Sequence, residues 1–111
     1  MLEKDITAAI TRYLKTVPHC FFWKEHGGQY GTAGLPDIIC CYRGRFVAFE
    51  VKAPSGRPSK LQEITIAKIK AAKGEACIVR SVGEGKKILD SLEVAHDEKG
   101  TVPAVLAGPG D

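Results

Sequence analysis

The sequence predicts an α/β fold in which helices flank a mixed β-sheet, with the elements in the order α-β-β-β-α-β-α. Apolar residues recur at helical spacing near the start of the chain. Three short runs rich in aromatic and β-branched residues follow, and helix and strand patterns then alternate. The 111 residues are enough for one domain with a single modest core.

The first 42 residues are expected to form one helix and two strands. A helix is expected over residues 3–15, and Val17-Pro18 ends it. Residues 21–24 form a short strand, and a glycine-rich loop over residues 26–34 leads to a second strand over 37–42. The apolar stripe of the helix consists of Leu2, Ile6, Ala9, Ile10, Tyr13 and Leu14.

A tight turn at Arg43-Gly44 joins the second strand to an antiparallel strand over residues 46–53. A helix follows over residues 59–73, then a strand over 76–82 and a helix over 84–92. We therefore expect one domain over residues 1–95. The remaining residues, 96–111, are rich in Gly, Pro and charge, and we expect a flexible tail or one docked on a partner subunit.

Composition excludes some classes of protein and permits others. A net charge of +3 permits nucleic-acid binding without requiring it. No apolar run has the length of a membrane span, and the first residues lack the pattern of a signal peptide. The four cysteines form no C-x-x-C pair and lie in or near apolar runs, which is typical of reduced core residues in a cytoplasmic protein.

Two charged residues interrupt the most apolar strand. Glu50 and Lys52 lie two positions apart, so their side chains extend from the same face of the strand. Burying both charges is costly unless they pair or bind a cation. The alternative is an ion pair on an exposed strand face. Phe46 and Ala48 on the same face argue against that alternative.

The hairpin brings a second carboxylate to Glu50. Asp37 lies six residues before Arg43, and Glu50 lies six residues after Gly44. In a two-residue turn these positions face each other, with Cβ atoms roughly 5 Å apart. Two opposed carboxylates repel unless a cation lies between them, so the register predicts a metal site. The alternative for Asp37 is a turn residue that follows Pro36.

These residues resemble the PD-(D/E)xK nucleases and, among them, the virus-type replication-repair nuclease (VRR-NUC) domain. The resemblance covers about residues 1–83, and residues after about 93 match no part of it. It implies a restriction-endonuclease-like mixed sheet flanked by helices and metal-dependent hydrolysis of DNA phosphodiesters. The motifs are G-L-P-D at 34–37, F-E-V-K at 49–52 and G-R-P-S-K-L-Q at 56–62.

The expected metal ligands are Asp37, Glu50 and the backbone carbonyl of Val51, around one Mg²⁺ or Mn²⁺. Lys52 would steer the attacking water and stabilise developing negative charge. The resemblance implies a further glutamate from the first helix, and we assign Glu3 because helical rotation places it beside the apolar stripe. Asp5, the other acid that could fill this place, is turned further towards solvent.

Gln62 has two interpretations, which can both hold. Ser59-Lys-Leu-Gln62 is a capping box, and the two side chains would satisfy the first amides of the helix. The resemblance instead implies that Gln62 faces the active centre, where it would orient water or phosphate. Lys24, Arg57 and Lys60 are the expected phosphate contacts, together with the glycine-rich loop. Arg43 and Arg45 are weaker candidates for the same role.

The resulting expectation is a structure-selective endonuclease that cuts branched DNA such as Holliday junctions. Small VRR-NUC domains resemble archaeal-type junction resolvases, which act as dimers, so a homodimer is expected. We expect it in the cytoplasm of a bacterium or of a phage-infected host cell. The alternatives are a non-catalytic DNA-binding module, an RNA-directed nuclease of the same fold, or a structural or redox domain.

Overall fold

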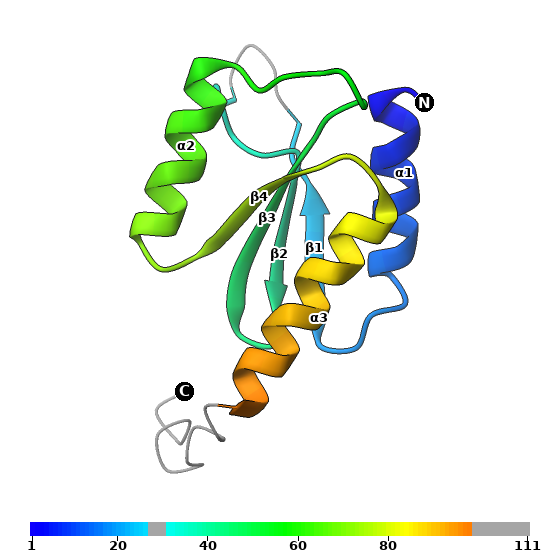
Figure 1. Cartoon of the computed structure of the whole chain (residues 1–111), viewed down its shortest axis with the longest axis vertical. Coiled ribbons are helices and arrows are strands. Elements are labelled where there is room, and N and C mark those ends of the chain that lie inside the picture. The colour runs from blue at the N-terminus through cyan, green and yellow to red at the C-terminus, as the bar shows by residue number, and fades with distance from the viewer. Residues whose placement is uncertain (27–30, 99–111) are drawn as a thin grey trace.

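A four-stranded mixed sheet forms the centre of the protein, shown in Figure 1 as a computed structural model that describes residues 1–26 and 31–98. The strand order is β1-β2-β3-β4. Each of the first three strands is antiparallel to its neighbour, and β4 is parallel to β3. The predicted mixed sheet and element order are confirmed. The strands are β1 Cys20–Lys24, β2 Ile38–Tyr42, β3 Arg45–Val51 and β4 Glu75–Val79.

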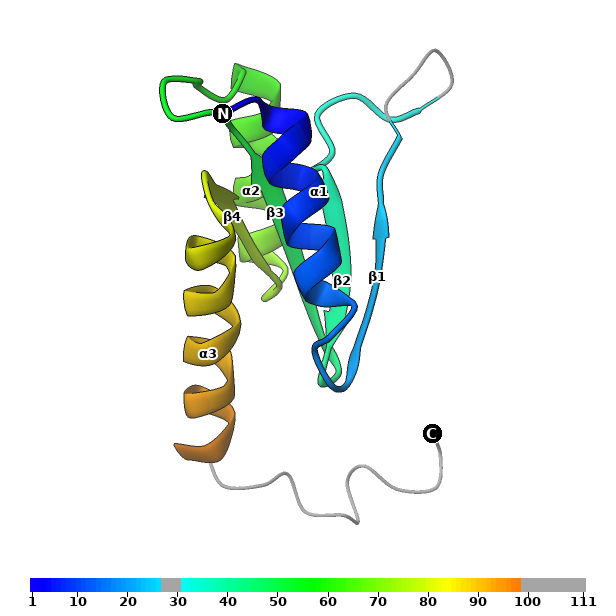
Figure 2. The same cartoon turned by 90° about the vertical axis from the view of Figure 1, so that its right-hand side faces the viewer.

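Three helices cover the two faces of the sheet. They are α1 Glu3–Leu14, α2 Lys60–Ala71 and α3 Val82–Glu98. Helices α1 and α3 pack on one face, and α2 lies on the other (Figure 2). Because β3 and β4 are parallel, the chain must cross from one end of the sheet to the other between them, and α2 makes this crossover.

The core explains which way Glu50 faces. Along β3, Val47, Phe49 and Val51 are buried against α1 and α3. The alternate residue Ala48 belongs to a smaller apolar cluster with α2 on the other face. Glu50 follows the same alternation and therefore extends towards α2.

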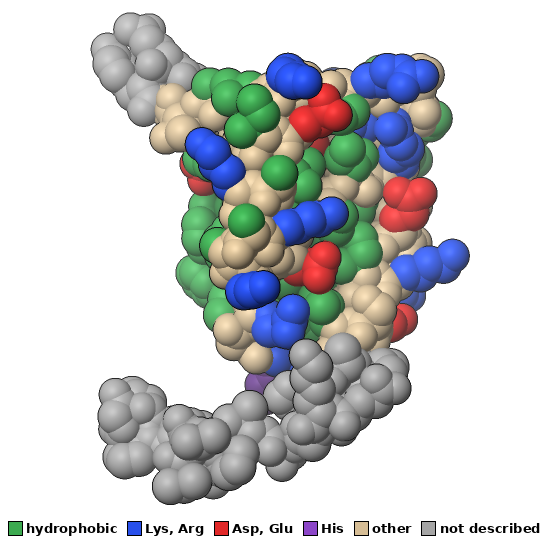
Figure 3. Space-filling view, turned by 60° about the vertical axis from the view of Figure 1, so that its left-hand side comes forward, with side chains coloured by type: hydrophobic (Ala, Val, Ile, Leu, Met, Phe, Trp, Pro, Cys, Tyr) green, Lys and Arg blue, Asp and Glu red, His purple; other side chains and the backbone are tan. Residues whose placement is uncertain are grey.

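Helix α2 leaves part of its own face of the sheet uncovered. Phe22 packs into the core beside α1, so Phe21 and Trp23 extend from the opposite face. Phe21 is 70% exposed, and Trp23 and Phe46 are each 45% exposed. Figure 3 shows exposed apolar side chains among Lys and Arg side chains on the side of the molecule that carries α2. We call Phe21, Trp23, Cys41 and Phe46 the open sheet face.

The hairpin between β2 and β3 has the predicted register. Its turn residues Arg43 and Gly44 have φ angles of 50° and 83°, as expected of a two-residue turn of type I′. Tyr42 pairs with Arg45, and the ladder continues without a bulge to Ile38 and Phe49. The next pair in this register is Asp37 opposite Glu50, as the sequence predicts.

The C-terminal elements differ from the prediction. Strand β4 ends at Val79 rather than at Val82, because the Ser81 hydroxyl accepts the Glu84 N–H and caps the start of α3. Helix α3 continues past residue 92 to Glu98, since no Gly or Pro interrupts it there. The expected domain end at residue 95 thus falls inside this helix.

Two predicted features lie wholly or partly outside the described residues. They are the tail, of which residues 99–111 are not described, and the glycine-rich loop, of which 27–30 are not. Within the described parts of the chain, none of the helices is long and apolar enough to span a membrane.

Candidate active site

Asp37 is held across the hairpin by a backbone hydrogen bond. Its Oδ2 accepts the N–H of Val51 at 2.8 Å. The preceding residue, Pro36, is buried, so the chain enters β2 from a fixed direction. The aspartate therefore lies at the end of the sheet where β3 finishes. It is not merely a turn residue after proline.

Glu50 is the buried member of the site, with only 2% of its surface exposed. Its Oε2 accepts the Gln62 Nε2–H at 3.0 Å and lies 3.4 Å from the Lys52 Nζ. Its Oε1 is buried and has no hydrogen-bond partner among the described residues. A buried carboxylate oxygen without a partner is rare, because desolvation makes it costly. This oxygen is available to a cation.

The protonation of Glu50 reflects this environment. The pKa of Glu50 is raised from its ordinary value of 4.5 to about 7, and burial is the largest cause. The neighbouring Asp37 carboxylate contributes to this rise, and the Lys52 ammonium opposes it. Without a cation, two carboxylates meet at this point with a single ammonium to balance them.

Lys52 lies just beyond the end of β3. Its backbone N–H donates to the Val79 carbonyl at 3.0 Å, which continues the pairing with β4 by one residue. The side chains of Lys52 and Glu50 are 12% and 2% exposed. The pair is therefore not an ion pair on an open strand face, and that alternative is excluded.

Gln62 forms the predicted capping box and also contacts Glu50, while its role in orienting water or phosphate stays a prediction. Its backbone N–H donates to the Ser59 hydroxyl at 3.1 Å, and its Oε1 accepts the Ser59 N–H at 2.8 Å, which completes the capping box. The remaining amide group, Nε2, donates to Glu50. The first turn of α2 is thus tied directly to the buried carboxylate.

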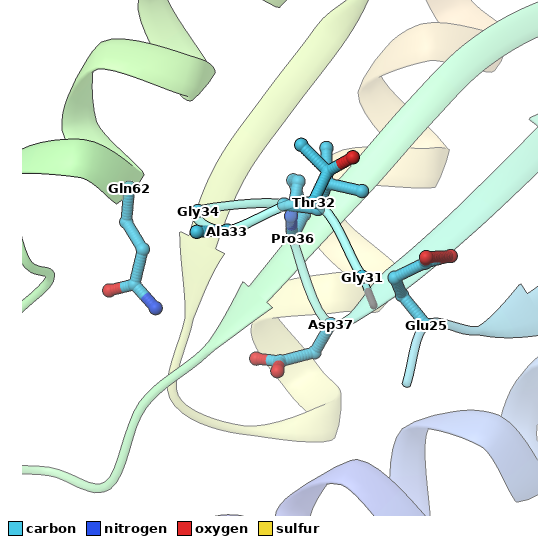
Figure 4. Close-up of a pocket in the computed structure, with 9 residues that line it drawn as sticks. Glu25, Gly31, Thr32, Ala33, Gly34, Pro36, Asp37 and Gln62 are labelled. Carbon is cyan, nitrogen blue, oxygen red and sulfur yellow. The ribbon is translucent and has the colours of Figure 1, made fainter. Parts of the chain in front are cut away.

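A pocket of about 310 Å³ opens beside these residues. It is lined by residues 31–37 together with Glu25 and Gln62. In Figure 4, Asp37 and Gln62 turn their polar ends towards the same space, while the Glu25 carboxylate points the other way. Glu25 is held in that direction by the indole N–H of Trp23, which donates to it at 2.9 Å.

Glu3 is not brought into the carboxylate pair. It is exposed on the first turn of α1, where its Oε2 lies 3.4 Å from the position that a Cβ at Gly56 would take. Among the side chains that the structure describes, in residues 1–26 and 31–93, no three His, Cys, Asp or Glu are close enough to hold a metal ion. Asp37 and Glu50 therefore form a pair of carboxylates, and the role of Glu3 stays a prediction.

The expected phosphate contacts surround this end of the sheet. Lys24 ends β1 and pairs with Ile38 at the start of β2, and Lys60 begins α2. Arg57 lies in the segment that joins β3 to α2. All three basic side chains are exposed. By contrast, Arg43 and Arg45 lie at the other end of the hairpin, where Arg43 is 3.5 Å from Glu93.

Two further residues near the site, Glu25 and Arg80, are not among those that the sequence predicts. Glu25 follows β1 directly, and its N–H donates to the Asp37 carbonyl at 2.7 Å. Arg80 follows β4 and contacts the segment after Lys52. The sequence does mark the place of Arg80 in the fold, because this residue directly precedes the helix-capping pattern Ser81-x-x-Glu84.

Comparison with known proteins supports the fold. No protein-family model matches the sequence, and no curated protein matches it. A solved structure described as a VRR_NUC domain superposes with a TM-score of 0.66. The match covers 79% of this chain and 94% of that one, at 18% sequence identity. The chain has the VRR_NUC fold. At this identity the likeness concerns the fold, so the activity must be argued from the site.

The burial of Glu50 in the VRR_NUC fold predicts an unusual dependence of stability on pH. Because its folded-state pKa of about 7 lies above the ordinary 4.5, protonation stabilises the metal-free protein below pH 4.5. This contribution is lost as the pH rises through 7, and it amounts to roughly 3 kcal/mol. In EDTA, the free energy of unfolding of the wild type should fall by that amount between pH 4 and pH 8, relative to the free energy of unfolding of Glu50→Gln.

Urea titrations at pH 4, 6 and 8 measure this difference. Glu63→Gln, which removes an exposed carboxylate from α2, is the control and should follow the wild type at every pH. A constant difference between the wild type and Glu50→Gln across this range would contradict the assigned burial of the carboxylate.

Proposed function

We propose that this chain is a metal-dependent deoxyribonuclease that hydrolyses phosphodiester bonds. The observation that carries the proposal is the buried Glu50 Oε1, which has no partner among the described residues although it lies beside the Asp37 carboxylate. The VRR_NUC fold supports the same conclusion, because the resemblance of the motifs implies nuclease chemistry. A charged side chain is costly to bury, and buried charged side chains with shifted pKa values cluster at sites that bind a ligand or an ion.

The donor atoms fit a hard divalent cation such as Mg²⁺ or Mn²⁺. Asp37 and Glu50 offer carboxylate oxygens, and the Val51 carbonyl is the third proposed ligand, with Glu3 contacting the ion directly or through water. When bound, the cation would lower the pKa of a water molecule and neutralise charge on the phosphate. It would also relieve the repulsion that raises the pKa of Glu50.

The protein side chains would supply orientation and charge. Lys52 is held at Glu50 and would direct the attacking water and stabilise negative charge that develops on the phosphate. Gln62 would keep the Glu50 carboxylate in one orientation, as outer partners of metal ligands do. The positive end of α2 begins at Lys60 and favours an anionic backbone nearby.

Binding of DNA would rest on its phosphates. The exposed side chains of Lys24, Arg57 and Lys60 lie around the site and would grip phosphates on either side of the scissile bond. Such contacts carry no sequence information. We therefore propose recognition of DNA shape, with branched DNA such as a Holliday junction as the substrate, in the cytoplasm.

A homodimer would suit a branched substrate, because a twofold axis relates two active centres to two strands. The open sheet face is the proposed interface. Its residues Phe21, Trp23, Cys41 and Phe46 are apolar or nearly so, and none carries a charge. Depletion of charge and enrichment in aromatic residues are typical of the core of a homodimer interface.

The first prediction from this proposal concerns Asp37. We expect Asp37→Asn to lower Mg²⁺-dependent cleavage by at least about 100-fold, because it removes a ligand charge. Cleavage would be measured on labelled linear, flapped and four-way DNA with Mg²⁺, Mn²⁺, Ca²⁺ or EDTA. We expect four-way DNA to be cut fastest. Ca²⁺ should support binding but little hydrolysis, because its looser coordination positions water poorly.

Glu63→Gln is the matched control in this assay, since it removes an exposed carboxylate of α2. Unchanged cleavage by Asp37→Asn would refute the site assignment. Wild-type binding without cleavage in any metal would favour a non-catalytic DNA-binding module. Faster cleavage of a labelled RNA of the same sequence would favour an RNA-directed nuclease.

A second prediction separates the two roles of Gln62. Gln62→Leu removes the hydrogen bond to Glu50, so we expect cleavage to fall roughly 10- to 100-fold. Ser59→Ala weakens the same helix cap but leaves the Gln62 amide beside Glu50. It should cost about 1 kcal/mol of stability and keep nearly full cleavage. Equal losses of cleavage in both variants would show that Gln62 acts only as a cap.

A third prediction concerns assembly. Light scattering at micromolar concentration should give the mass of a dimer for the wild type. Changing Phe21 and Trp23 together to Ser should halve that mass, because it removes most of the apolar area of the open sheet face. Leu2→Ser, at another exposed apolar position, is the control and should stay dimeric. A monomeric wild type would contradict the proposed interface.

A further inference from the structure

The segment between β3 and α2 determines how Lys52 and Gln62 meet Glu50. It covers residues 53–58 and contains one turn, in which the Gly56 N–H donates to the Ala53 carbonyl at 2.9 Å. At one end this segment continues from Lys52, and at the other it leads into the cap of α2. Any movement of its backbone would shift both side chains.

Arg80 holds this segment from outside. Its Nη1 donates to the carbonyls of Ala53 and Gly56 at 2.7 Å each, and it lies 3.4 Å from the Pro54 carbonyl. The residue before it, Val79, accepts the Lys52 N–H. Two consecutive residues at the end of β4 thus fix the backbone on both sides of the Lys52 side chain.

The direction of Arg80 is itself fixed by the first turn of α3. The Arg80 N–H donates to the Glu84 Oε1 at 2.7 Å, and the Glu84 N–H donates to the Ser81 hydroxyl at 3.2 Å. The side chain is half-buried. A guanidinium can donate to several carbonyls from one plane, which an ammonium on a flexible stem does less well.

We infer that Arg80 is a positioning residue for the proposed nuclease, and the inference rests on that proposed function. Its guanidinium binds the carbonyls of Ala53 and Gly56 and so keeps the Lys52 ammonium at the Glu50 carboxylate. The hydrogen bonds of this guanidinium to the described residues are made to backbone carbonyls and not to the Asp37, Glu50 or Lys52 side chains. Its effect therefore falls on the rate of the chemical step more than on the affinity for DNA.

Single-turnover cleavage at saturating DNA, with Mg²⁺, tests this inference. We expect Arg80→Ala to lower the rate constant on the order of 10- to 100-fold, the effect of losing an outer partner of a catalytic group. The Kd for four-way DNA in Ca²⁺ should change much less than the rate constant, since two of the three proposed phosphate contacts, Lys24 and Lys60, lie outside this segment. Arg80→Lys keeps the charge and should show a smaller loss with a melting temperature near that of the wild type.

Chemical rescue separates positioning from simple stabilisation. Millimolar guanidinium chloride should restore part of the rate of Arg80→Ala, whereas NaCl at the same ionic strength should not. Arg12→Ala, which removes an exposed arginine from α1, is the control and should cleave like the wild type. A rate within twofold of the wild type in Arg80→Ala, or a loss without rescue that follows the melting temperature, would overturn the inference.

Amide hydrogen exchange gives a readout that does not depend on cleavage. The Gly56 amide should lose protection in Arg80→Ala and keep it in Arg12→Ala. If the wild type cut no DNA, the proposed function would fail, and this exchange would still decide the inference about Arg80. Unchanged protection of Gly56 would overturn it, and lost protection would support it.

Discussion

The buried carboxylate of Glu50 is the constraint on which the site depends. One of its oxygens is satisfied by Gln62 and Lys52, and the other has no partner among the described residues. A negative charge in this place is unfavourable, and the raised pKa of Glu50 expresses that cost. The end of β3 brings the Lys52 ammonium to it and the first turn of α2 brings the Gln62 amide, whereas the hairpin brings a second carboxylate, Asp37. Among the described residues, the Lys52 ammonium is the cationic group within ion-pair distance of this carboxylate.

The topology of the sheet makes this convergence possible. Strand β3 is an interior strand, paired with β2 on one side and with β4 on the other. The hairpin brings Asp37 to its end from one side, and the parallel pairing brings Arg80 there from the other. Crossing to β4 requires a connecting segment, and α2 starts at this same end of the sheet. The fold thus places groups distant in sequence around the last residues of one strand.

The rules of hairpin register and helix capping were sufficient to predict the Asp37–Glu50 pair and the capping box at Gln62. Counting outward from the Arg43-Gly44 turn placed Asp37 opposite Glu50, and the count held because the ladder has no bulge. The capping pattern at Gln62 was equally visible, although its contact with Glu50 needed the resemblance. The sequence does not predict the contacts of Arg80, because its partners are backbone carbonyls rather than side chains. The parallel pairing of β3 with β4 brings them together. The sequence predicts an end of the last helix at Leu92, but α3 continues to Glu98, because charged and polar residues are as compatible with a helix as with a tail.

The two ends of the Gln62 amide have fixed roles. Its oxygen is occupied by the Ser59 N–H, so only the nitrogen can face Glu50. A rotated amide would break the helix cap and set two acceptors against each other. Oε2 of Glu50 therefore accepts a hydrogen bond from this amide, and the lone pairs of Oε1 are not used by a donor among the described residues. Because the helix cap commits one oxygen of this carboxylate to the Gln62 amide, the other is the atom that would hold a cation.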